Sequence, residues 1–186
     1  MRSGFVAIVG RPNVGKSTLL NAMVGTKVSI TSSRPNTTRF NVRGVLHAED
    51  AQAVFVDTPG LHRPRNALGG RLNETAMSSL ADVDVVVPVL DATAAVGPGD
   101  RLVLQNAVRA VAHARSGAGL LVVVNKTDRA KPTQLLERLT EAAETVGALA
   151  PDVPSGVVES AEYFPVAART GAGVGPLVQA VLGLLE

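Results

Sequence analysis

The sequence contains no cysteine, no tryptophan and only 3% aromatic residues. Without cysteine the chain cannot form disulfides, thiolate zinc sites or iron–sulfur clusters, and it has no thiol nucleophile. Its three histidines, His47, His62 and His113, are widely spaced, which argues against a histidine-based metal site. The few aromatic side chains leave almost none of the stacking platforms that bind single-stranded nucleic acid. We therefore expect an aliphatic core.

The sequence also lacks a large excess of charge of one sign and a long apolar run. The 18 basic and 16 acidic residues give a net charge of +2, which is not the footprint of a strong nucleic-acid binder. No apolar run approaches the ~18 residues of a membrane span, and the N-terminus lacks the features of a signal peptide. We therefore expect no transmembrane segment and a cytoplasmic protein. The 186 residues, 46% hydrophobic, suit one domain.

What is present is an alternation of apolar and helix-like segments. The apolar runs predict strands at residues 5–9, 41–47, 52–56, 83–90, 119–124 and 163–167. Helical spacing predicts helices at residues 16–24, 71–80, 100–115, 133–149 and 174–185. The polar segments 26–39 and 58–70 are typical of loops. The pattern predicts an α/β fold: a mostly parallel six-stranded sheet with helices on both faces and one antiparallel hairpin, formed by the second and third strands.

Two residues suggest local features of these elements. Pro88 lies inside an apolar run that should be a central strand, and it lacks the N–H that such a strand donates. We therefore expect a bulge or irregularity at Pro88. Thr133 stands at the predicted start of a helix, where a hydroxyl can cap the free N–H groups.

Residues 10–17, GRPNVGKS, fit the pattern G-x-x-x-x-G-K-[ST] between a predicted strand and a predicted helix. The loop N–H groups form an anion nest, and the helix N-terminus adds its dipole. Lys16 can reach the β- and γ-phosphates of a nucleotide, and the Ser17 hydroxyl can bind Mg²⁺. The alternative is a chance glycine-rich turn. The phosphate-binding residues would be Asn13, Val14, Gly15, Lys16, Ser17 and Thr18.

A second motif, Asp57 to Gly60, follows the third strand. The Asp57 carboxylate can hold Mg²⁺ through water, and the Gly60 N–H can touch a γ-phosphate. The same pattern is also a common turn. It gains weight from its place at the carboxyl end of a strand, where open α/β sheets bind ligands.

The third motif, at residues 125–128, follows an apolar strand. Asp128 can accept from N1–H and the 2-amino group of guanine, a donor pair that adenine lacks. Asn125 can tie this base loop to the phosphate loop, and the stem of Lys126 can cover the ring. A charged turn is the alternative. After the last strand, within Ala167, Ala168 and Arg169, the Ala168 N–H could donate to guanine O6.

Together these motifs resemble those of translation-factor-class GTPases along the whole chain. Residues 4–13, 30–39 and 57–62 resemble the Era family of ribosome-assembly GTPases. The resemblance implies a P-loop NTPase fold, an Era-type GTPase domain over residues 1–186, and hydrolysis of GTP to GDP and phosphate with Mg²⁺. It implies small-ribosomal-subunit assembly as the role, with ribosomal RNA as a partner. It assigns Thr38, in preference to Thr37, to Mg²⁺ and the γ-phosphate.

The family resemblance also gives the catalytic set Lys16, Thr38, Gly60 and Asn13, with Ser17, Thr38 and Asp57 around the metal. Related GTPases use an asparagine at the position of Asn13 to bind K⁺, which suggests stimulation by potassium. The alternative is that Asn13 only caps the loop through a local hydrogen bond. Leu61 stands where Ras-like enzymes place a water-orienting glutamine, so slow basal hydrolysis is expected.

Two departures from the family pattern stand out. Ala167 stands where the fourth motif usually has serine, and the 186 residues contain no Gly-x-x-Gly clamp of the family's RNA-binding KH domain. Two other functions stay open. One is a nucleotide-gated binding switch with negligible hydrolysis. The other is a single GTPase domain of the Der-like or tRNA-modification families, which residues 57–62 disfavour. The sequence carries no signal of oligomeric state.

Overall fold

The computed structural model describes residues 1–25, 41–57, 82–114, 117–154 and 156–186. The strands are β1 (Arg2–Gly10), β2 (Asn41–His47), β3 (Ala51–Asp57), β4 (Val85–Asp91), β5 (Gly119–Asn125) and β6 (Glu162–Val166). The helices are α1 (Lys16–Val24), α3 (Pro98–His113), α4 (Pro132–Gly147) and α5 (Val174–Gly183), with short 3₁₀ turns at Thr127–Arg129 and Ala150–Asp152. The predicted helix at 71–80 and the predicted loops at 26–39 and 58–70 lie outside the described residues.

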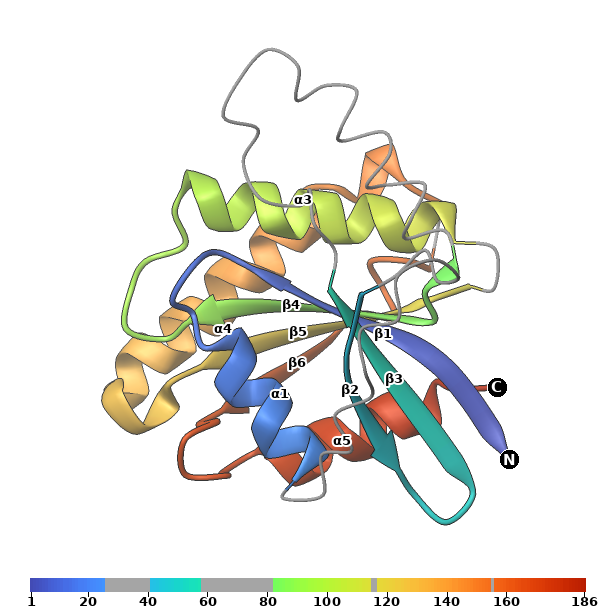
Figure 1. Cartoon of the computed structure of the whole chain (residues 1–186). Helices are drawn as coiled ribbons and strands as arrows, with labels where there is room; N and C mark the ends of the chain where they lie inside the picture. The colour runs from blue at the N-terminus through green and yellow to red at the C-terminus, as the bar shows by residue number, and fades with distance from the viewer. Residues whose placement is uncertain (26–40, 58–81, 115–116, 155) are drawn as a thin grey trace.

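The six strands form one sheet in the order β2-β3-β1-β4-β5-β6. All neighbouring strands run parallel except β2 and β3, which are antiparallel and lie at one edge. Helices α3 and α4 cover one face of the sheet, and α1 and α5 cover the other (Figure 1). The predicted α/β architecture, with its single antiparallel edge pair, is confirmed.

The hydrophobic core has two layers, one on each face of the sheet. In β4, Val85, Val87 and Val89 pack with α1 and α5, whereas Val86 and Leu90 pack with α3 and α4. All five side chains are at most 2% exposed. A strand covered on both faces needs apolar residues at every position, which is why this segment shows no polar alternation.

Pro88 causes no bulge, but the predicted local irregularity is present as a break in the β4–β5 pairing. Pro88 pairs with Val9 of β1, and β4 keeps the same register against β5 before and after the proline. No partners are assigned on the β5 side at Val87 and Pro88, so the sheet tolerates the missing donor there without inserting a residue. The register shift lies instead in the edge strand β2, between Val42 and Gly44. Edge strands accept such shifts because they are paired on one side only.

The prediction that Thr133 caps a helix is wrong. Helix α4 begins one residue earlier, at Pro132, because proline suits the first helical position. The N-cap residue is Lys131, whose backbone N–H donates to Gln134 Oε1 at 2.9 Å. Strand β1 begins at Arg2 rather than at residue 5, because the polar residues before Phe5 pair with β3, Arg2 opposite Ala51.

The carboxyl ends of the parallel strands meet at one edge of the sheet. The loops that follow β1, β4, β5 and β6 all leave from this edge, which is where open α/β sheets bind ligands. The loops after β1, β5 and β6 carry polar motifs of the sequence, and β4 ends in Asp91. Among the helices that the structure describes, none is long and apolar enough to cross a membrane.

Candidate functional site

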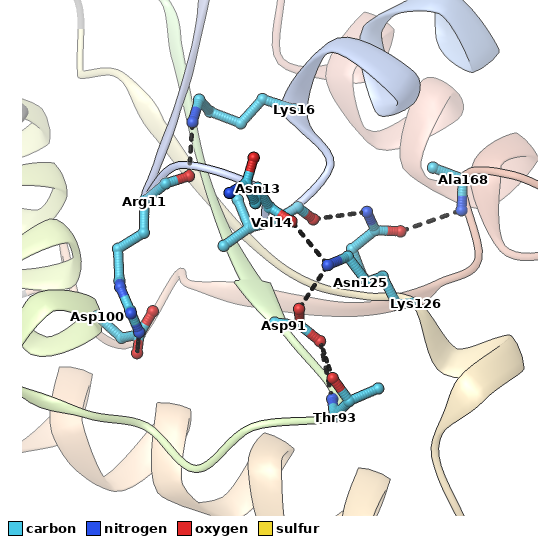
Figure 2. Close-up of polar contacts among 10 residues, drawn as sticks. All are labelled: Arg11, Asn13, Val14, Lys16, Asp91, Thr93, Asp100, Asn125, Lys126 and Ala168. Carbon is cyan, nitrogen blue, oxygen red and sulfur yellow. Dashed lines mark hydrogen bonds and ion pairs between the residues drawn. The ribbon is translucent and has the colours of Figure 1, made fainter.

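The phosphate loop joins β1 to α1 and depends on two left-handed residues. Asn13 has φ 66° and Gly15 has φ 97°. A Cβ atom at Gly15 would collide with the Asn125 side-chain nitrogen, so glycine is required there for space as well as for conformation. Lys16 opens α1, and its Nζ donates to the carbonyl oxygens of Gly10 (2.8 Å) and Arg11 (2.7 Å). These bonds fold the ammonium group back over its own loop (Figure 2).

Ser17 and Thr18 follow Lys16 in the first turn of α1, and both are exposed. A pocket of about 290 Å³ lies against Lys16 and Ser17 and is also lined by Ile8, Leu20, Arg43, Phe55 and Val56. Asp57 ends β3 opposite Asn41. The remaining predicted metal and catalytic residues, Thr38 and Gly60, lie outside the described part of the chain, as does Leu61.

Asn125 is the buried polar centre of the site. Its side chain is at the carboxyl end of β5, and the residue is 2% exposed. Its Nδ2 donates to the Val14 carbonyl oxygen at 2.9 Å, which is the expected link to the phosphate loop. Its Oδ1 accepts from the Ala168 N–H at 3.0 Å. Figure 2 shows Asn125 between these two loops, so one amide fixes both at once.

The contact at Ala168 is one that the sequence did not predict. We expected its N–H to face guanine O6, and in the structure it donates to Asn125. Ala167, at the position of the family's serine, is 1% exposed, and its N–H donates to the Ala172 carbonyl oxygen at 2.9 Å. The loop after β6 therefore closes on itself through backbone bonds and does not need the missing hydroxyl.

Lys126 ties the base loop to two further segments. It adopts a left-handed conformation, φ 68°, and its Nζ donates at 2.6 Å to both the Asn13 carbonyl oxygen and Asp91 Oδ2 (Figure 2). Its side chain is 25% exposed and that of Asp91 is 20% exposed. The ammonium group is thus held between the phosphate loop and the end of β4, which fixes the direction of the stem that we expected to cover a ring.

Asp91 is a site residue that sequence reasoning missed. Burial alone would raise the pKa of its carboxyl. The hydrogen bonds from Lys126 and from the Thr93 hydroxyl and N–H, with the charge of Lys126, outweigh burial and hold that pKa below its ordinary value of 3.8. The available signal was position: Asp91 ends a buried strand at the same sheet edge as Gly10 and Asn125.

Asp128 and Arg169 meet across the open end of the site. Arg169 Nη2 lies 2.9 Å from Asp128 Oδ2, and their side chains are 67% and 15% exposed. Both line a pocket of about 110 Å³ at the base loop, whose other lining residues are Gly15, Thr18, Asn125, Lys126, Arg129 and Ala168. The pocket thus brings the predicted base-reading residues next to the start of α1.

Arg11, in the phosphate loop, points away from that pocket. Its Nη1 lies 2.9 Å from Asp100 Oδ2, on a side chain that is only 6% exposed (Figure 2). The same Asp100 oxygen accepts from the Gly97 N–H at 3.0 Å, at the start of α3. One buried carboxylate therefore joins the phosphate loop to the N-terminus of a neighbouring helix.

Comparison with known proteins gives consistent results. A family model described as "50S ribosome-binding GTPase" matches residues 5–126. GTPase Era of Mycolicibacterium paratuberculosis is 46% identical over 184 residues, covering 99% of this chain and 56% of the relative. The chain thus spans about half the length of the curated relatives it matches.

Two solved structures are similar along the whole chain. Era in complex with MgGDPNP and a segment of 16S ribosomal RNA has a TM-score of 0.69 and 37% identity, and the match covers 58% of that chain. A variant of Aquifex aeolicus Era bound to GDP·AlF₄⁻ has a TM-score of 0.66 and 36% identity, also over 58% of that chain. These matches confirm the P-loop GTPase fold.

Proposed function

The chain belongs to the family of 50S ribosome-binding GTPases, and from this premise we propose that it binds guanine nucleotides and hydrolyses GTP to GDP and phosphate, as one Era-like GTPase domain over residues 1–186. The observation that carries the proposal is Asn125, because its two hydrogen bonds join the phosphate loop and the base loops into one site.

The base would be read at Asp128, in the pocket beside Ala168 and Lys126. An ionised carboxylate accepts hydrogen bonds only, so it pairs with the two donors of guanine and has nothing to offer adenine. The nucleotide-binding set that we propose is Asn13, Val14, Gly15, Lys16, Ser17, Thr18, Asp57, Gly60, Asn125, Lys126, Asp128, Ala167, Ala168 and Arg169.

Magnesium fits the residues at the start of α1. Mg²⁺ prefers hydroxyl, carboxylate and phosphate oxygens, and the exposed Ser17 hydroxyl borders the 290 Å³ pocket next to Lys16. We assign Ser17, Thr38 and Asp57 to the metal, which when bound neutralises charge on the β- and γ-phosphates. Lys16 would exchange its loop carbonyls for phosphate oxygens, and the Gly60 N–H and Thr38 would complete the catalytic set with Asn13.

The possible potassium site depends on Asn13. Asn13 is exposed, and its carbonyl oxygen accepts a hydrogen bond from Lys126 Nζ. Its side-chain amide has no hydrogen-bond partner within the described residues. Among the described residues, the Asn13 side chain forms no local capping bond, which supports the potassium role over that alternative. A K⁺ ion held by the Asn13 amide oxygen would supply charge that Leu61 cannot. Turnover measured in KCl and NaCl at equal ionic strength, for the parent and Asn13→Ala, tests this; equal rates in both salts contradict it.

Calorimetry with GDP, GTP and ATP in Mg²⁺ tests the binding proposal directly. We expect tight binding of GDP and GTP and none of ATP. Asp128→Asn should move the preference towards xanthine nucleotides, which present a carbonyl where guanine has its amine. Comparable affinity for ATP and GTP in the parent would contradict the proposal.

Single-turnover hydrolysis separates the enzyme from its alternative, a binding switch. A rate above that of GTP in buffer, lost in Lys16→Ala, supports the GTPase. We further propose that the chain acts in the cytoplasm in small-ribosomal-subunit assembly, with ribosomal RNA as a partner, because Era has been solved with 16S ribosomal RNA. Co-sedimentation of the chain with 30S subunits in GTP, compared with GDP, tests this role.

A further inference from the structure

Arg169 lines the base pocket and pairs with Asp128, and this pair is given no role in the proposed function. We propose that Arg169 is a positioning residue: it holds the Asp128 carboxylate in the orientation that receives both guanine donors, and so sharpens the preference for guanine. The inference rests on the proposed guanine-binding function. It deepens that function by giving Arg169, one of the proposed nucleotide-binding residues, a specific role: it acts on the base through Asp128.

The backbone around Arg169 is fixed before any ligand binds. Ala168, the preceding residue, is bonded to Asn125. The following residue, Thr170, donates its N–H to the Ala167 carbonyl oxygen at 3.0 Å, and the Ala167 N–H donates to Ala172 at 2.9 Å. The contact of Arg169 with Asp128, 41 residues away in sequence, therefore depends on a rigid turn rather than on a loose loop.

Asp128 needs such a partner because its own position is weakly constrained. It lies in a three-residue 3₁₀ turn, and the residue as a whole is exposed although its side chain is only 15% exposed. Among the described residues, Arg169 is its only hydrogen-bond donor. Without this bond the carboxylate could rotate about its side-chain torsions, and a two-point contact with guanine would then cost ordering entropy.

The ion pair leaves room for the base. An ionised carboxylate has two oxygens with about four acceptor positions. Arg169 uses one position on Oδ2, through a single nitrogen. Oδ1 and the second position on Oδ2 stay available for the N1–H and 2-amino donors. The arginine therefore orients the acceptor without competing for it.

The test is a comparison of two nucleotides rather than one affinity. GDP offers Asp128 two donors, whereas IDP lacks the 2-amino group and offers one. Binding of GDP, IDP and ADP is measured by calorimetry for the parent, Arg169→Ala and Arg169→Lys. Arg129→Ala is the matched control, because Arg129 lines the same pocket and forms no ion pair with Asp128 within the described residues.

We expect Arg169→Ala to weaken GDP binding about two- to fivefold, the range for an exposed ion pair, and IDP binding by less than twofold. The GDP-over-IDP preference should fall in this variant, be restored in part by Arg169→Lys, and stay unchanged in Arg129→Ala. Equal losses for GDP and IDP would mean that Arg169 contacts a shared part of the nucleotide, and would overturn the inference. Tighter GDP binding would make Arg169 a competitor and would overturn it too.

The two proposals fail in different ways in this experiment. If the parent binds ADP as well as GDP, the proposed guanine function fails, and the inference falls with it. If the parent prefers GDP and Arg169→Ala keeps the full GDP-over-IDP preference, the function stands and the inference alone is wrong. Urea unfolding of each variant shows whether a change in binding reflects a change in fold.

Discussion

The phosphate side and the base side of the site are built in different ways. In the phosphate loop, Lys16 bonds to carbonyls five and six residues away. On the base side, the three contacts of Asn125 and Lys126 with Val14, Ala168 and Asp91 join residues 35 to 111 positions apart. The first is a local structure that one short motif can encode. The second exists only when the whole sheet has formed.

This difference predicts where mutations act. A change at Lys16 should affect binding and leave folding nearly intact, because the bonds of its side chain that the structure describes stay within the loop. A change on the base side should affect both, because the same side chains hold the ends of several strands together. The predictions that follow test the phosphate side, the base side and the contacts between them, from the largest expected effect to the smallest.

Lys16→Ala should weaken phosphate binding and leave the base side unchanged. We expect GTP affinity to fall by about a hundredfold, since hydrogen bonds to charged groups contribute up to about 3 kcal/mol and 1.4 kcal/mol is about tenfold. Stability should change by less than about 1 kcal/mol, because the side chain is not buried. Calorimetry with GTP and urea unfolding measure the two effects, with the exposed Lys131→Ala as control. A large loss of stability would show that the loop is not locally built.

Asn125→Ala should damage both sides together. It removes two buried hydrogen bonds and leaves the Val14 carbonyl and the Ala168 N–H without their partner. We expect a loss of about 2 kcal/mol in the free energy of unfolding, with weaker GDP binding. Urea unfolding without nucleotide isolates the structural part. If stability is unchanged and only binding falls, the two hydrogen bonds of Asn125 support nucleotide binding but do not stabilise the fold.

Arg11→Ala tests the ion pair between the phosphate loop and the start of α3. It leaves the buried Asp100 carboxylate without its cation, although Arg11 itself is half-exposed. We expect a loss of about 1–2 kcal/mol in unfolding free energy, less than for a fully buried pair. Asp50→Ala, which breaks the exposed pair with Arg2, is the matched control and should cost under about 0.5 kcal/mol. Equal effects of the two variants would contradict this prediction.

Asp91→Asn should give the smallest effect and a pH signature. The pKa of Asp91 is lowered in the folded protein, so the folded state binds its proton less readily than the unfolded chain. The stabilisation by this carboxylate is therefore present above pH 3.8 and is lost as the pH falls through the lowered value. We expect the variant to be less stable than the parent by about 1 kcal/mol at pH 7. That difference should shrink below pH 3.8 in urea unfolding.

The sequence was sufficient for the parts of the molecule that depend on local pattern. The apolar runs located the six strands, and helix α1 has the predicted bounds, because buried parallel strands and a glycine-rich loop leave clear local signals. The helix start at Thr133 was misjudged, and Pro88 produced only a break in pairing and no bulge, because both rules treat a residue in isolation. The sheet absorbed the proline without a bulge, and Pro132 with Gln134 set the helix start that Thr133 was expected to set.

The support of the site was the part that could not be predicted. Asp91 contacts Lys126, 35 residues away, and Arg169 contacts Asp128, 41 residues away. No short sequence motif predicts pairs so far apart. Likewise the hydrogen bond from the Ala168 N–H to Asn125 was not predicted, since the reach of Asn125 depends on how β5 and β6 lie side by side.

The two hydrogen bonds of the Asn125 side chain also have a mechanical consequence. The turn after β6 is linked to Val14 through one amide group, which is hydrogen-bonded directly at both ends. Moving that turn away from β5 would therefore also displace the Val14 carbonyl group, and with it the loop between β1 and α1. The position of the phosphate loop thus depends on a surface turn near the opposite end of the sequence.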